Sequence, residues 1–237
     1  MFAINCLAND MREVIEGFNT RLIEVEQFIK FVKRMQRPGV AGKIGIQQGQ
    51  EFLPMLKACV FLLLYNAIES CVRSAFSDVY FQIKTNNISF QGTTQAVQKI
   101  WLTQQLDAHI SVANANRDTY LNAVSLIANQ ISLGSGLDLN ARELPISGSL
   151  NADLIRELCR KHGVSLKTSV WAKGGVELDT IKTKRNALAH GHISFVECGR
   201  EYDLNDLERM HRQTKHFMKG LLTSLANYSQ TTGYKVA

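Results

Sequence analysis

Apolar residues recur at alternating steps of four and three from residue 11 to residue 32, and this spacing narrows the possible folds more than any other feature. The positions are Met11, Ile15, Phe18, Leu22, Val25, Ile29 and Val32. Such a seam lies along one face of an α-helix and needs another helix to cover it. Asn9 or Asp10 can cap this helix, and Pro38 predicts its end near residue 37. The seam therefore favours packing inside a helical bundle over a coiled coil with a partner.

A second long helix is predicted over residues 52–84, which include the run ACVFLLLYNAIESCVRSAF. Only three prolines occur in 237 residues, so long helices are not interrupted. The middle of this segment is apolar nearly all round, which predicts the central, most buried helix. Asn66, Glu69 and Arg73 interrupt the run on one face. A buried carboxylate needs a cation or several donors, so Glu69 pairs either with Arg73 or with an arginine from another helix.

Four further helices are predicted from apolar spacing, over 93–106, 117–131, 177–189 and from Asp203 to about 228. Asp203 caps the last helix, whose inward residues are predicted as Leu207, Met218, Leu221, Leu225 and Tyr228. Residues 192–202 are interpreted as a short extended connection. We therefore expect an all-α fold with a single domain over residues 1–237.

The segment 133–175 has a different composition from the predicted helices. Its first part, LGSGLDLNARELPISGSLN, is rich in glycine, serine and asparagine. A short helix follows, with Asn151 as its cap and Gly163 as its stop. We expect 133–175 to be a small, loop-rich lobe inserted before the helix 177–189.

Charge is concentrated in one segment of the chain. The net charge is +6, and between residues 156 and 185 eight cations oppose three carboxylates, a difference of +5. The cations are Arg156, Arg160, Lys161, Lys167, Lys173, Lys182, Lys184 and Arg185. Such a run is either a solvated surface or a patch that attracts phosphate groups.

The cysteines and the N-terminus indicate a reducing compartment. Five cysteines, an odd number without a CxxC pair, are typical of free thiols. The N-terminus has no signal-peptide pattern, and the longest apolar run, 58–65, is too short to span a bilayer. We expect a cytoplasmic protein with no membrane partner. His190, His192 and Cys198 lack a fourth ligand and a recognised spacing, so we expect neither metal nor cofactor.

The strongest candidate for chemistry is Arg185 with His190, in the stretch KTKRNALAHGHISF. Four arginine–histidine pairs in the chain have four to six residues between them, so spacing alone does not select one. Only the Arg185 pair has an asparagine after the arginine and a glycine after the histidine. Residues five apart on a helix lie about 140° apart, so the two side chains converge only if the helix ends near His190. Gly191 predicts that end, and the helix carbonyls there favour a protonated imidazole.

These residues carry a resemblance to the HEPN superfamily, most similar to the bacterial MAE-type HEPN-like nucleases. The matching blocks are LLLYNAIESCVR, ISGSLNADLIRELCRKHGV and RNALAHGHISFVECGREYDLNDL, within about 52–207. The resemblance implies a helical bundle that forms a homodimer in which two Rx4-6H motifs face one cleft. It also implies RNA cleavage without metal, to a 2′,3′-cyclic phosphate and a 5′-hydroxyl. A toxin or defence effector with an antitoxin or defence-system partner is implied by the resemblance alone.

The chemistry of each candidate residue is compatible with a role in this reaction. Arg185 clamps the scissile phosphate, and His190 acts as general base or acid. Asn186 orients the histidine or a phosphate oxygen. Glu69 or Asn66, on the same face as Arg73, holds Arg185 in place. The cations expected to guide the RNA backbone are Lys182, Lys184, Arg156, Arg160 and Lys161.

Two alternatives remain at this point. One is a HEPN module without catalytic activity that binds RNA, a nucleotide or a protein. The other is a structural helical adaptor whose partner surface is the seam from Met11 to Val32.

Overall fold

The computed structural model describes residues 10–37, 49–110, 116–146 and 148–236. Within these ranges the chain forms eight α-helices, three short 3-10 turns and no β-strand. The α-helices are α1 (Asp10–Met35), α3 (Gly49–Thr85), α4 (Gln95–His109), α5 (Arg117–Leu133), α6 (Ala152–Lys161), α7 (Val176–Ala189), α8 (Phe195–Arg200) and α9 (Leu204–Gln230). The 3-10 turns are η1 (Phe90–Gly92), η3 (Ala141–Glu143) and η4 (Val170–Gly175). The predicted all-α fold is confirmed.

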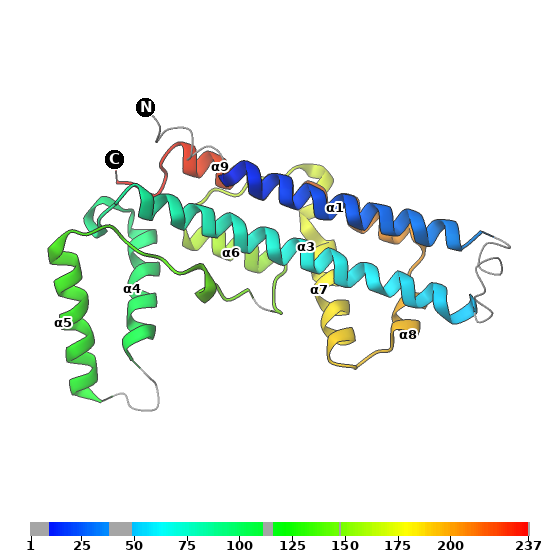
Figure 1. Cartoon of the computed structure of the whole chain (residues 1–237), viewed down its shortest axis with the longest axis horizontal. Coiled ribbons are helices and arrows are strands. Elements are labelled where there is room, and N and C mark those ends of the chain that lie inside the picture. Colours follow the sequence, from blue (N-terminus) through cyan, green and yellow to red (C-terminus); the bar gives the residue numbers. More distant parts are fainter. Residues whose placement is uncertain (1–9, 38–48, 111–115, 147, 237) are drawn as a thin grey trace.

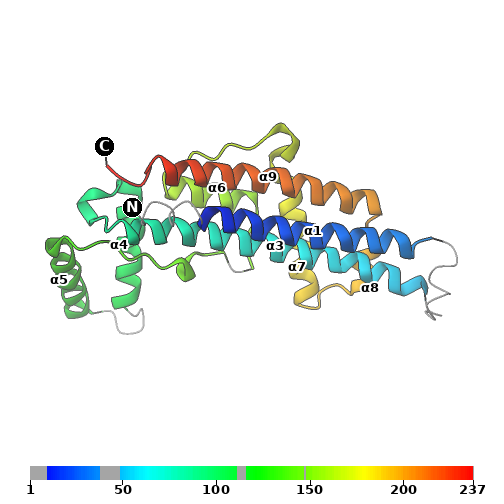
Figure 2. The same ribbon diagram turned by 45° about the horizontal axis from the view of Figure 1, so that its top comes forward.

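The helices α1, α3 and α9 lie side by side and form the long body of the molecule (Figures 1 and 2). The apolar seam of α1 faces this bundle, and Phe18, Val25 and Val32 are buried. The predicted inward residues of α9 are all buried as well. Asp203 caps α9, accepting a hydrogen bond from the backbone N–H of Asp206 at 2.8 Å. Both helices therefore bury their apolar faces against other helices of the same chain.

The central helix α3 contacts α1, α7, α8 and α9. An 18-residue window within Glu51–Thr85 has a mean hydropathy of 1.6, which is high enough for a membrane span. Half of that window is buried inside the fold, as in the core helix of a bundle. One face of α3 stays open, because Asn66 is exposed and Leu62, Leu63 and Glu69 are only half-buried.

The extended connection predicted for 192–202 is wrong, because α8 forms there. Ser194 caps α8 by accepting from the backbone N–H of Glu197 at 3.1 Å, and the Glu197 carboxylate accepts from the Ser194 N–H at 2.9 Å. Gly199 lets α8 approach α3 closely, since a Cβ atom there would lie 1.8 Å from the carbonyl oxygen of Pro54. The reciprocal cap and the close contact between helices thus outweigh the preference of the β-branched and aromatic residues in this short segment for an extended backbone.

Two pairs of helices project from the same side of the long body, α4 with α5 near one end and α7 with α8 further along (Figure 1). The segment 133–175, expected as an inserted lobe, connects α5 to α7 and contains η3, α6 and η4. Asn151 caps α6 as predicted, and Gly163 follows the helix with a φ of +74°. Ile146, Leu150, Ile155, Leu158 and Ala172 of this segment belong to the same hydrophobic core as the long helices.

Candidate active site

Helix α7 carries the motif and ends where the sequence predicts. Gly191 has a φ of +69°, which suits glycine because it has no Cβ atom. The N–H of Gly191 donates to the carbonyl of Leu188 at 3.3 Å, and the N–H of His192 donates to that of Ala187 at 2.9 Å. This pair of bonds is a Schellman motif, and it places His190 at the C-cap, directly after the last helical residue Ala189.

The side chain of Arg185 is half-buried against α3. Its Cζ atom lies 4.3 Å from the centroid of the Tyr65 ring, a cation–π contact. Its Nη1 atom donates a hydrogen bond to Oδ1 of Asn186 at 3.0 Å. An aromatic ring and an amide oxygen therefore hold the guanidinium from two sides.

Asn186 joins the motif helix to the loop before α6. Its Nδ2 atom donates to the carbonyl oxygen of Gly148 at 2.7 Å, while its Oδ1 atom accepts from Arg185. Both ends of the amide are thus engaged. These contacts make Asn186 a positioning residue for Arg185.

His190 differs from Arg185 because it is exposed to solvent. Its ring centroid lies 5.8 Å from that of His192, with the two planes at 34°. Within the described ranges, no side chain donates to or accepts from the His190 imidazole through a hydrogen bond. Five residues advance about 7.5 Å along a helix, so His190 follows Arg185 by about 1.4 turns. No hydrogen bond joins the two side chains in the part of the chain that the structure describes. The exposed imidazole is free to exchange protons with a ligand.

Tyr65 is the site residue that the sequence analysis missed. The ring is buried, and its hydroxyl accepts from the backbone N–H of Leu150 at 3.3 Å. Burial raises the pKa of Tyr65, and the neighbouring Glu69 raises it further, whereas the Arg185 charge lowers it. The sequence feature that could have identified Tyr65 is its position in LLLYNAIES, one helical turn before Glu69.

Glu69 and Asn66, the residues of α3 predicted to hold Arg185 in place, have different surroundings. Glu69 pairs with Arg73 along α3, with an Nη2–Oε1 distance of 3.6 Å. Asn66 is exposed on the same face. The direct contact with Arg185 comes from Tyr65.

The cations predicted to guide RNA are mostly engaged in ion pairs. The pairs are Arg156–Asp153, Lys161–Glu157, Lys182–Asp179 and Lys184–Glu201. Arg160 is exposed at the end of α6 and has no ion pair in the part of the chain that the structure describes. The five cations lie on two helices and do not form one continuous free surface around Arg185.

The other arginine–histidine pairs in the chain have structural contacts. The ring of His162 is buried, and its Nδ1 donates to the carbonyl of Leu158 at 2.7 Å. Its Nε2 then accepts from the hydroxyl of Tyr80 at 2.6 Å. Arg209 pairs with Glu177 and with Asp206. His190, His192 and Cys198 belong to no group of potential metal ligands found among the described residues, and Cys198 is buried.

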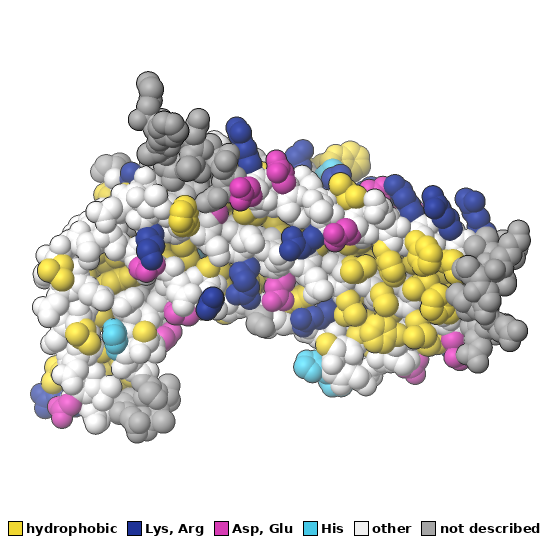
Figure 3. All heavy atoms as spheres, viewed as in Figure 1, with side chains coloured by type: hydrophobic (Ala, Val, Ile, Leu, Met, Phe, Trp, Pro, Cys, Tyr) yellow, Lys and Arg dark blue, Asp and Glu magenta, His cyan; other side chains and the backbone are white. Residues whose placement is uncertain are grey.

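An apolar surface lies on the bundle beside the end of α7, and we name it the α3 apolar face. It consists of Phe28 and Phe31 of α1 and Phe52, Met55, Cys59, Leu62 and Leu63 of α3, all exposed or half-buried. Figure 3 shows a broad hydrophobic patch over these two helices, free of charged side chains at its centre. A shallow cavity of about 560 Å³ lies between Met55 of this face and the turn after α7, and it is lined by Met55, Leu188, Gly191, His192 and Phe195 among others.

Comparison with known protein families gives a match over most of the chain. The model of the family described as HEPN_MAE_28990:/-like HEPN matches residues 11–234. Neither a curated protein nor a solved structure matches the chain. The match covers nearly the whole chain, including α3, α7 and the motif.

Proposed function

Because the chain belongs to the HEPN family whose model matches residues 11–234, we propose that it is a metal-independent endoribonuclease. The observation that carries this proposal is the arrangement at the end of α7. Arg185 is held by Tyr65 and Asn186, and His190 is exposed at the end of the same helix. A fixed cation and an exposed imidazole are the groups that the proposed cleavage of a phosphodiester uses.

The proposed reaction uses the 2′-hydroxyl of the RNA as the nucleophile. An imidazole takes the proton of the 2′-hydroxyl, and the 2′-oxygen forms a bond to phosphorus. The bond from phosphorus to the 5′-oxygen breaks, and that oxygen receives a proton from an imidazolium. Arg185 stabilises the negative charge on the phosphoryl oxygens through its planar donor fork. The products are a 2′,3′-cyclic phosphate and a 5′-hydroxyl.

The working form is proposed to be a homodimer. In-line displacement needs a base on one side of the phosphorus and an acid on the other, and one motif supplies one His190. The α3 apolar face lies beside the motif and has no charge at its centre. In a two-fold dimer each residue near the axis meets its own copy, so an uncharged apolar surface suits self-association. Docking of two such faces would bring two motifs to one cleft.

The proposed biological role is that of a toxin or defence effector in the cytoplasm. This role is supported by the resemblance to MAE-type HEPN-like nucleases. It implies single-stranded or transfer RNA as the substrate class, and an antitoxin or defence-system protein as a partner.

The proposal is tested by incubating the purified full-length protein with unstructured RNA in the presence of EDTA. We expect cleavage that persists in EDTA, products with a 2′,3′-cyclic phosphate by mass spectrometry, and no cleavage of a 2′-O-methyl analogue. His190→Ala is expected to abolish cleavage while sedimentation shows an unchanged dimer. His216→Ala is the matched control, because that histidine lies within α9.

Two results would decide for another function. RNA or nucleotide binding without cleavage, unchanged in His190→Ala, would indicate a HEPN module that lacks catalytic activity. No affinity for RNA, with no effect of Arg185→Ala, would indicate a structural adaptor.

A further inference from the structure

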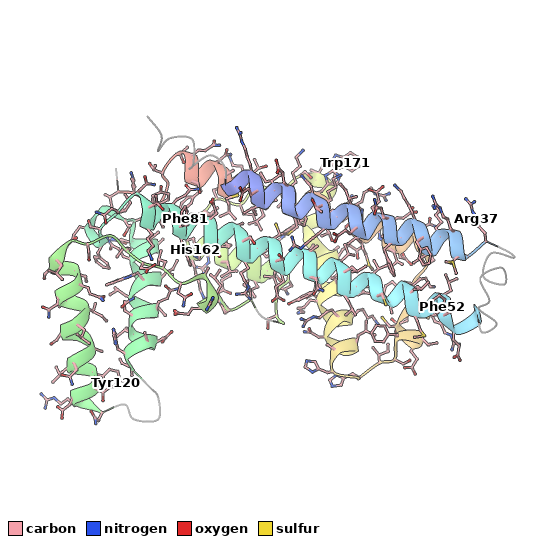
Figure 4. The ribbon with its side chains drawn as sticks, viewed as in Figure 1. Arg37, Phe52, Phe81, Tyr120, His162 and Trp171 are labelled. Carbon is pink, nitrogen blue, oxygen red and sulfur yellow. The ribbon has the colours of Figure 1, made fainter. Side chains whose placement is uncertain are left out.

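A tryptophan is held in solvent on a rigid turn, away from the motif. Trp171 is 67% exposed and its neighbour Val170 is 82% exposed, both in η4. Figure 4 places Trp171 at the edge of the molecule opposite to the projecting α7 and α8. We name residues 167–174 the Trp171 turn.

Contacts with α6 and α9 fix the Trp171 turn in place. Ala172 is fully buried, and the N–H of Lys167 donates to Oγ of Ser224 at 3.0 Å. Arg156 donates to the carbonyl of Gly174, and its Cζ lies 5.6 Å from the centroid of the Phe217 ring. The exposed indole therefore belongs to a backbone that is anchored at both ends.

The close approach of the turn to α9 depends on two glycines. A Cβ atom at Gly175 would lie 2.7 Å from the ring of Phe217, and one at Gly220 would lie 2.5 Å from the carbonyl oxygen of Lys167. Gly175 also has a φ of +81°. The backbone is thus shaped to lie flat on α9 while Val170 and Trp171 point outward.

The charge around the Trp171 turn is positive. No aspartate or glutamate occurs in 158–176 or in 209–237, the segments that form the turn and most of α9. Lys167, Lys173 and Lys219 are exposed, and Lys219 precedes the glycine that the Lys167 backbone crosses. The nearby Asp153 carboxylate is paired with Arg156 at 2.8 Å. The indole therefore lies among lysines for which the described residues provide no ion pair.

We propose that the Trp171 turn, with Lys219, is a binding surface for single-stranded RNA that is separate from the motif. A flat indole stacks on a base of any sequence, and lysines on both sides attract the flanking phosphates. An acidic protein segment would use the lysines but would not need the exposed ring. Helix α7 has 14 residues and separates the turn from His190 by about 20 Å. The inference goes beyond the proposed cleavage and does not depend on it.

The test measures binding of a labelled 2′-O-methyl oligouridine of about 12 nucleotides, which cannot be cleaved through a 2′-hydroxyl. Fluorescence anisotropy with the full-length protein is expected to show saturable binding. Trp171→Ala is expected to weaken it about tenfold, and Trp171→Phe less, because a smaller ring still stacks. In Lys167→Gln/Lys173→Gln, the slope of log Kd against log salt is expected to fall by about 1.4.

Matched controls separate this surface from other exposed rings and lysines. Tyr120→Ala removes another exposed aromatic ring, and Lys30→Gln/Lys84→Gln removes two exposed lysines elsewhere. These variants are expected to bind as the wild type does. In a Trp101→Phe background, fluorescence from Trp171 is expected to be quenched by the oligonucleotide.

Three results would overturn the proposal. The first is no binding of the oligonucleotide, and the second is binding that Trp171→Ala leaves unchanged. The third is binding of a poly-glutamate peptide that depends on Lys167 and Lys173 while the oligonucleotide does not bind, which would indicate an acidic protein partner. Loss of RNA cleavage in His190→Ala bears only on the proposed function.

Discussion

The guanidinium of Arg185 lies over the ring of Tyr65, with a distance of 4.3 Å between its Cζ atom and the ring centroid. This contact joins the motif helix α7 to the core helix α3. The Tyr65 hydroxyl also accepts from the backbone of Leu150, just before α6. The direction in which Arg185 points is therefore set by a buried aromatic residue whose ring and hydroxyl contact different parts of the chain.

Two substitutions of Tyr65 are expected to distinguish the effect of its hydroxyl contact from that of its ring contact. Tyr65→Phe keeps the ring under Arg185 and loses one hydrogen bond, so the free energy of unfolding should fall by about 1 kcal/mol with cleavage largely retained. Tyr65→Leu also removes the cation–π contact, and cleavage should fall about tenfold below that of Tyr65→Phe. Denaturant unfolding and single-turnover cleavage rates measure the two effects. Equal rates in the two variants would show that the ring does not position Arg185.

Replacing Gly191 is expected to disturb the end of α7. Gly191→Ala places an L-residue at a φ of +69°, and no other atom lies within 4 Å of the new Cβ, so the cost of about 1 kcal/mol arises from the backbone alone. Gly134→Ala is a matched control, because Gly134 has a φ of +64° and similarly open surroundings. Denaturant unfolding should show similar losses for both variants, and only Gly191→Ala should lower cleavage. A cleavage defect of the same size in Gly134→Ala would contradict this prediction.

The buried His162 is expected to make stability depend on pH below neutrality. Burial lowers the pKa of His162 from its ordinary value of 6.5 to about 4. Between these values the unfolded chain binds a proton that the folded chain does not, so stability falls as the pH falls from 6.5 toward 4. The loss over this range is roughly 3 kcal/mol.

His162→Gln is the control for this pH dependence. Its amide can donate to Leu158 and accept from Tyr80 as the neutral imidazole does, without titrating. Unfolding by urea at several pH values between 4 and 7 should show a smaller slope for this variant. A slope equal to that of the wild type would assign the effect to other groups.

The α3 apolar face is expected to mediate dimer formation. Leu63→Glu places a charge on this face, where the proposed dimer would bury it, and should raise the dimer dissociation constant at least about a hundredfold. Leu121→Glu on α5 is the control, because Leu121 is 54% exposed and lies far along the chain from this face. Sedimentation velocity measures the oligomeric state. A Leu63→Glu protein that remains dimeric would place the interface elsewhere.

The sequence alone determined the helices and the location of the motif. The seam from Met11 to Val32, the cap at Asp203 and the stop at Gly191 act within one or two turns of the helix that they define. Such signals depend on residues three to five apart, so they can be identified without knowledge of the fold. The α8 helix was missed although Ser194 and Glu197 form the same kind of local cap, because its β-branched and aromatic neighbours favoured an extended segment.

Only the tertiary structure decided which side chains meet across helices. The partner of Arg185 on α3 is Tyr65, while Glu69 pairs with Arg73. Likewise, several cations of the segment 156–185 form ion pairs in the folded chain. The turn that carries the exposed Trp171 lies beside α9. These relations depend on how helices rotate and pack against one another. That packing is set by the burial of the whole core, which no local spacing determines.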